Sequence, residues 1–117
     1  IIWLGQQHSF SSGSADLRTS FEGTLGSVGA AINDVGGIIR VEGHTDNVPI
    51  GFSERFKSNW DLSSARSASV ANYIIDNTAL EPGRLSIAGF ADSKPIETND
   101  TAAGRARNRR IEVIVDG

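Results

Sequence analysis

The stretch Ile-Ile-Arg-Val-Glu-Gly-His-Thr-Asp, at residues 38–46, combines a strand-like run with the polar residues that directly follow it. Its first five residues are mostly β-branched, which is typical of a short strand, and Gly43 marks the strand's end. The polar residues that follow lie where a strand gives way to a loop. Such positions often carry ligand-binding side chains, because the rigid strand aims them. We therefore expect a strand at residues 38–42 with a polar site at its carboxyl end.

An amphipathic helix is predicted before this strand. Apolar residues recur there at steps of three or four, as on one face of a helix: Leu17, Phe21, Leu25, Val28, Ile32 and Val35. Ser14 or Asp16 can cap this helix, and Gly36-Gly37 ends it. Glycines inside the pattern each cost about 1 kcal/mol of helix propensity. The helix is therefore expected to depend on packing, or to admit a close neighbour.

A second helix is expected at residues 62–77, capped by Ser58 or Asp61. Shorter elements complete the pattern: strands at 1–10, 84–91 and 109–115, and a helical segment at 101–107 capped by Asp100 or Thr101. This order predicts an α/β fold, an α+β sandwich with its helices on one face of the sheet. Residues 44–61 follow neither a helical nor a strand period, and so long a loop in a small domain is usually functional or mobile.

Composition limits the classes of function. The 117 residues, 12.4 kDa in mass, suit a single domain spanning 1–117. The chain has 11 basic and 14 acidic residues, a net charge of −3, and so lacks the positive field of a nucleic-acid-binding protein. It has no cysteine, which excludes thiol nucleophiles, iron–sulfur clusters and disulfides. No apolar run approaches the ~20 residues of a membrane span. Because the chain starts at Ile1, we expect it to be a fragment of a longer protein.

Asp46 and Arg66 are the candidate binding residues by their own chemistry. Asp46 offers a carboxylate for an ammonium group, unless it only caps a turn. Arg66, four residues after Leu62 on one helix face, can hold a carboxylate through two hydrogen bonds. The plainer alternative is a weak surface ion pair with Asp61 or Asp46. Together the two residues suit a zwitterion such as the free end of an amino acid. His44 is expected to be a packed, hydrogen-bonded residue rather than a metal ligand.

Four arginines crowd residues 105–110. Without accompanying aromatic residues or a nucleic-acid-binding motif, we expect one or two of them to be buried structural donors and the others to be solvated. No nucleophile–base–orienter set, Walker A motif or Gly-x-Ser-x-Gly motif is present. We therefore expect a protein that is not an enzyme and that has neither cofactor nor metal.

Three motifs, in this order and spacing, resemble the OmpA-like C-terminal domain: VEGHTDNVPI at 41–50, SNWDLSSAR at 58–66 and NRRIEV at 108–113. Within that family the chain is most similar to the B subunits of the flagellar motor stator, MotB and PomB. That likeness rests on FSSGSA at 10–15, on the Ser-Asn-Trp-Asp-Leu-Ser run, and on Asn-Asp-Thr before Gly-Arg-Ala at 99–106. The resemblance extends from about Phe10 to Val115.

The resemblance implies a βαβαβ-type core with a further strand, in a mixed sheet packed on two main helices. It also implies non-catalytic binding of peptidoglycan through the diaminopimelate residue of the stem peptide. Asp46 would take its ammonium and Arg66 its carboxylate. The resemblance further implies contacts from Thr45, Asn59 and Leu62, and supporting, mostly structural roles for Asn108 and Arg110.

Placed in that family, the chain is expected to be the periplasmic domain of a single-pass inner-membrane protein that anchors the stator to the cell wall. The implied partners are peptidoglycan, a second copy in a homodimer, and the stator A subunit through a membrane segment. Alternatives are a dimerisation module that gates the stator channel, an OmpA/Pal-type outer-membrane anchor and, least favoured, a wall hydrolase. Two features depart from the family. Ser11 replaces a frequent acidic residue near the ammonium, and Asp46 and Arg66 are 20 residues apart, which is longer than in many members.

Overall fold

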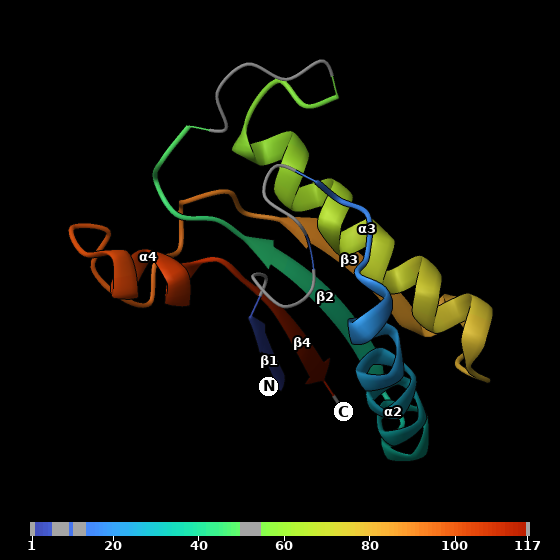
Figure 1. Cartoon of the computed structure of the whole chain (residues 1–117). Helices are drawn as coiled ribbons and strands as arrows, with labels where there is room; N and C mark the ends of the chain where they lie inside the picture. Colours follow the sequence, from blue (N-terminus) through green and yellow to red (C-terminus); the bar gives the residue numbers. More distant parts are fainter. Residues whose placement is uncertain (1, 6–9, 11–13, 50–54, 117) are drawn as a thin grey trace.

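The computed structural model describes residues 2–5, 10, 14–49 and 55–116, which form a four-stranded sheet and three helices (Figure 1). In chain order the elements are β1 (Ile2–Gly5), α2 (Thr19–Val35), β2 (Ile38–His44), α3 (Asn59–Asn77), β3 (Leu85–Gly89), α4 (Ala102–Asn108) and β4 (Arg110–Asp116). A short 3-10 helix (Pro82–Arg84) precedes β3. The predicted order of elements is confirmed.

The sheet is mixed, with strand order β1-β4-β2-β3. Strands β2 and β3 are parallel neighbours joined through α3, as expected for a strand–helix–strand unit. Strand β4 lies between β1 and β2 and is antiparallel to both. The last strand of the described chain is therefore central, and this places the arginines before it beside the end of β2.

Both long helices cover one face of the sheet, as predicted. Alternate residues of β2 and β4 point to that face and are fully buried, among them Ile39, Val41, Ile111 and Val113. They share one apolar cluster with residues of α2 and α3: Phe21, Leu25, Ile32, Val70 and Ile74. Because side chains alternate along a strand, Glu42 and His44 point to the opposite face.

Several predicted boundaries were wrong by a few residues. Helix α2 begins at Thr19 after Arg18, which makes no side-chain capping bond, so neither proposed cap serves it. Ser14 instead accepts a hydrogen bond from the backbone N–H of Asp16 in the preceding turn. Val35, expected on the buried stripe, is 67% exposed at the end of the helix. The Ser14 hydroxyl is used inside the turn, so it does not cap the helix. Val35 is exposed because it is the last residue of α2.

Helix α3 begins at Asn59, three residues earlier than predicted. Ser58 caps it by accepting a hydrogen bond from the N–H of Asp61, and Thr101 caps α4 in the same way through Gly104. The expected close approach at a glycine of α2 occurs at Gly29, where an added Cβ would lie 2.6 Å from Thr78 Cγ2. In the described part of the chain, no helix combines the length and apolar character required to cross a membrane.

Candidate functional site

The candidate site begins where β2 ends. Thr45 N–H donates to the Ala91 carbonyl at 2.8 Å and Phe90 N–H donates to the Gly43 carbonyl at 2.9 Å, so the β2–β3 pairing continues past both strands. This pairing holds Asp46 in a fixed position just beyond the sheet. The Thr45 hydroxyl adds a bond to the Asp46 carbonyl, at 2.8 Å.

The Asp46 carboxylate is largely buried and already has two partners. Its Oδ1 accepts the Val48 N–H at 3.0 Å, which is the turn-capping bond that the sequence left open. Its Oδ2 lies 2.6 Å from Arg109 Nη1, and 10% of the Asp46 side chain is exposed against 36% of the Arg109 side chain. A carboxylate can accept about four hydrogen bonds, so Asp46 retains capacity for a ligand ammonium.

Helix α3 reaches this strand end because two glycines admit it. A Cβ at Gly43 would lie 2.3 Å from the Ser63 carbonyl oxygen, and one at Gly89 would lie 2.2 Å from Ser64 Oγ. The Ser63 hydroxyl also accepts the Ala91 N–H at 3.1 Å. The first turns of α3 are thus pressed against the carboxyl ends of β2 and β3, where parallel strands commonly place ligand groups.

Arg66 projects from the second turn of α3 into a buried position. Its Nε donates to the Ser14 carbonyl at 2.8 Å, and its guanidinium lies over the Phe10 ring, 5.0 Å from the centroid. Burial, and then the charge of Arg109, lower the pKa of Arg66 to about 10. Arg66 therefore stays charged at neutral pH. The observed environment is a buried one and differs from the solvent-exposed surface pair considered from the sequence.

Arg109 is the site residue that sequence reasoning missed. It follows α4 and precedes β4, within the Asn-Arg-Arg motif, yet a run of arginines gives no indication of which one faces the site. Its ion pair with Asp46 and its electrostatic effect on Arg66 put one carboxylate and two guanidinium groups in the same region. Arg110 is the first residue of β4, whereas Arg109 lies between α4 and that strand, which explains why the two have different surroundings.

Asn59 and Leu62 lie on the first turn of α3. Asn59 Nδ2 donates to the Val48 carbonyl at 2.9 Å, so it ties the loop after Asp46 to the helix. Leu62 is buried in a small apolar cluster with Ala15 and Phe56. Both residues therefore support the region around Asp46. Ser11, the predicted position beside the ammonium, lies outside the described residues.

Asn108 and Arg110 hold the loop between β3 and α4. Asn108 Oδ1 accepts the N–H groups of Ile96 and Glu97 at 2.8 and 2.9 Å, and its Nδ2 donates to the Glu97 carbonyl and to Asn99 Oδ1. Arg110 donates to the Lys94 and Asn108 carbonyls at 2.9 and 3.0 Å. These bonds suit a structural role.

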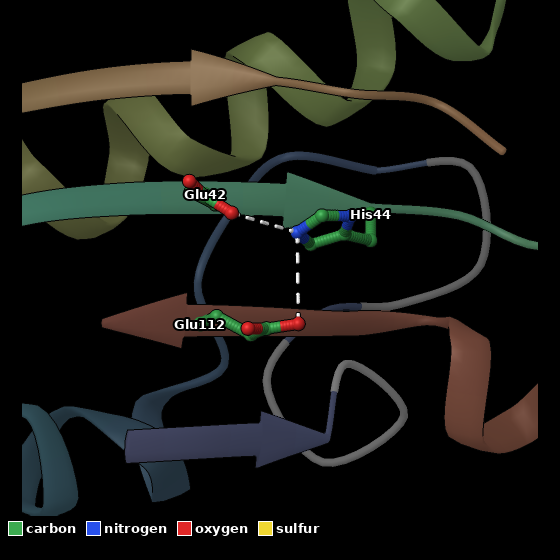
Figure 2. Close-up of side chains that lie close together, drawn as sticks. All are labelled: Glu42, His44 and Glu112. Carbon is green, nitrogen blue, oxygen red and sulfur yellow. Dashed lines mark hydrogen bonds and ion pairs between the residues drawn. The ribbon is translucent and has the colours of Figure 1, made fainter. Parts of the chain in front are cut away.

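On the sheet face away from the helices, Glu42, His44 and Glu112 form a buried cluster (Figure 2). His44 Nε2 lies 3.3 Å from Glu42 Oε1 and 3.7 Å from Glu112 Oε2. These ligand atoms are close enough together to hold a cation. However, Arg40 is 2.6 Å from Glu42 and Arg110 is 2.5 Å from Glu112. Since each carboxylate already has a cationic partner, the cluster is best explained as a structural ion-pair network between β2 and β4.

The His44 ring is further enclosed by the loop after β3. It stacks on Phe90, with ring centroids 5.2 Å apart, and the Lys94 ammonium covers the same Phe90 ring at 4.0 Å. Burial, and secondarily the charge of Arg110, lower the pKa of His44 from 6.5, whereas Glu112 and Glu42 oppose that shift. His44 is therefore the packed histidine that the sequence led us to expect.

Comparisons with known proteins agree with this architecture. Motility protein B of Bacillus subtilis is 44% identical over 77 residues, which are 66% of this chain and 29% of that protein. The structure of the cell wall anchor of the T6SS from Pseudomonas aeruginosa superposes with a TM-score of 0.89 at 39% identity, covering 97% of this chain and 78% of that one. The periplasmic domain of Helicobacter pylori MotB gives a TM-score of 0.87 at 25% identity, covering 98% and 75% of the two chains.

The sequence pattern of the OmpA family matches residues 9–109, a range that contains the end of β2, the start of α3 and the arginines before β4. The chain has the mixed sheet and helices of the MotB periplasmic domains. It therefore belongs to the OmpA family.

Proposed function

We propose that this domain binds peptidoglycan without catalysis and anchors a flagellar stator complex to the cell wall. The observation that carries the proposal is the ion pair of the buried Asp46 carboxylate with Arg109 at one end of the sheet, together with Arg66, whose pKa the charge of the same Arg109 lowers. The relatives with MotB and cell-wall-anchor names support the wall-anchoring role. The likeness to MotB periplasmic domains supports a periplasmic location. We also propose the stator A subunit and a second copy of the chain as partners.

The ligand group we propose is the diaminopimelate residue of the stem peptide, which has a free ammonium and a free carboxylate on one carbon. Asp46 accepts the ammonium and Arg66 holds the carboxylate. Arg109 fixes the Asp46 carboxylate from the other side. Charge-assisted hydrogen bonds of this kind are roughly twice as strong as neutral ones. Thr45 and Asn59 hold the two backbone segments that flank the ligand, and Leu62 packs beside them.

The test separates the two ends of the zwitterion. Binding of stem tripeptides that end in diaminopimelate or in lysine is measured by calorimetry, because lysine has the ammonium but lacks the second carboxylate. We expect Asp46→Asn to weaken both peptides. We expect Arg66→Gln to weaken the diaminopimelate peptide about tenfold or more and to leave the lysine peptide nearly unchanged.

Retention on purified sacculi provides the matching macromolecular measurement. Arg84→Gln is the control, since Arg84 donates to the carbonyls of Gly37 and Ile32, away from the site. Thermal unfolding of each variant shows whether it is folded. Equal retention of folded Asp46→Asn, Arg66→Gln and the parent chain would contradict the assigned site.

A further inference from the structure

An exposed tryptophan, Trp60, lies in the first turn of α3, next in the chain to Asn59, which is hydrogen-bonded to the loop after Asp46. Trp60 is 53% exposed and Val48 is 52% exposed, although both have large apolar side chains. Single exposed apolar residues are common on proteins, so exposure alone has little meaning. Within the described residues, the other large exposed apolar side chains are Val35, Ile38 and Ile87, on α2, β2 and β3. Val48 differs from these because its N–H donates to Asp46, and Trp60 differs because it follows Asn59, whose side chain donates to the Val48 carbonyl.

Val48 links the candidate carboxylate to the helix that carries the tryptophan. Its N–H donates to Asp46 Oδ1 at 3.0 Å, while its carbonyl accepts from Asn59 Nδ2 at 2.9 Å. Asn59 immediately precedes Trp60. Among the large exposed apolar side chains of the described residues, Val48 and Trp60 are thus the two linked to Asp46 through these hydrogen bonds.

The backbone of Trp60 is held firmly. The Trp60 carbonyl accepts the Ser63 hydroxyl at 3.2 Å, and that same hydroxyl accepts the Ala91 N–H at 3.1 Å. Asp61, the next residue, has its N–H bonded to Ser58 Oγ and its carboxylate bonded to the Lys57 N–H. An aromatic side chain on a fixed backbone has only two χ angles to order when a ligand covers it, which favours its use in binding.

We propose that Trp60, with Val48, is a subsite for the amino-sugar rings of the glycan strand that carries the stem peptide. This proposal rests on the proposed function. The C–H faces of a pyranose ring stack on an indole face, while the indole N–H can donate to a ring substituent. The glycan strand is joined covalently to the stem peptide, so a peptide held on Asp46 brings amino-sugar rings to this part of the surface at high effective concentration.

The first test uses Trp60 as its own reporter. The chain has two tryptophans, so in a Trp3→Phe background all indole fluorescence comes from Trp60. We expect an N-acetylglucosamine tetramer, an uncharged oligomer of N-acetylated amino sugars, to shift this emission in a saturable way. A mannose oligomer of equal length is the control. Emission that does not respond to the N-acetylglucosamine tetramer would overturn the proposal.

The second test separates this subsite from the peptide site. We expect Trp60→Ala to weaken retention on sacculi about five- to tenfold, and to leave the affinity for the diaminopimelate tripeptide within about twofold. Val35→Ala, which truncates an exposed side chain on α2, is the matched control and should change neither. If Trp60→Ala lowers tripeptide affinity as much as sacculus retention, or lowers neither, the glycan subsite is wrong. The proposed function fails separately, through an unchanged Asp46→Asn variant.

Discussion

Two ionic clusters are built from the same two chain segments and differ in how completely they are enclosed. Glu42, His44, Arg110 and Glu112 lie near the carboxyl end of β2 and the start of β4, and each is less than 9% exposed. Asp46 lies two residues after His44 and Arg109 one residue before Arg110, so this pair meets just beyond the sheet, where Arg109 keeps 36% of its side chain exposed. An enclosed ion pair has little room for a further partner, whereas a partly exposed pair such as Asp46–Arg109 retains room for one.

The largest expected effect comes from breaking the enclosed cluster. Replacing Arg110 with methionine leaves the Glu112 carboxylate buried without its 2.5 Å partner. Removing one member of a buried ion pair costs about 3–5 kcal/mol. We therefore expect Arg110→Met to lower the free energy of unfolding by about that amount, as measured by urea denaturation. A loss smaller than about 1 kcal/mol would show that the cluster behaves as an exposed one.

A methyl group added at Gly43, where β2 packs against α3, should have the next largest effect. Gly43 separates Glu42 from His44, and an added Cβ there meets the backbone carbonyl of Ser63 at 2.3 Å. We expect Gly43→Ala to cost about 1–3 kcal/mol, because α3 must move away from β2. The same displacement should weaken sacculus retention. Gly26→Ala is the control, since its Cβ meets no atom within 4 Å, and it should stabilise helix α2 by about 0.5–1 kcal/mol.

A moderate effect is expected from pH, and only in the enclosed cluster. The pKa of His44 is lowered from 6.5 in the folded chain, so the unfolded chain binds a proton at a higher pH than the folded chain does. The free energy of unfolding should therefore fall as pH falls through 6.5 toward the folded pKa, by at most about 1.4 kcal/mol per pH unit.

Denaturation between about pH 5 and 7.5 in a His8→Gln background isolates this contribution, because the chain has two histidines. The groups that face His44 are Glu42, Glu112, Arg110 and the Lys94–Phe90 pair, and they stay unchanged in the comparison. His44→Gln should flatten the profile. A profile of the same slope in His44→Gln would assign the dependence to other groups.

The smallest effect on stability is expected at Arg109, next to the most sensitive arginine. Its ion pair with Asp46 is partly exposed, and such pairs contribute about 0–1 kcal/mol. Arg109→Met should thus barely change urea denaturation. It should still weaken sacculus retention about threefold, because Asp46 loses the group that orients its carboxylate. Equal destabilisation by Arg109→Met and Arg110→Met would remove the distinction between the two clusters.

The sequence determined much of this protein through local patterns. Periodicity and turn residues predicted each described α-helix and strand. A resemblance carried by three motifs identified the OmpA family from the sequence alone. The same motifs contain Asp46 and Arg66. These were predicted to bind a ligand because a carboxylate and a guanidinium complement the ammonium and the carboxylate of a zwitterion. The failures were local too: helix α2 does not use Ser14 or Asp16 as its cap, since the turn before it takes up the Ser14 hydroxyl.

Only the tertiary structure decided which arginine joins the site. Arg109 and Arg110 are adjacent and chemically identical, so no sequence pattern distinguishes them. Strand β4 is central and antiparallel to β2, and its register places Arg110 opposite His44. Arg110 is thereby committed to the buried cluster with Glu112, and Arg109, just before the strand, reaches Asp46. Pairing between strands that are distant in sequence sets this division, and local sequence does not encode such long-range register.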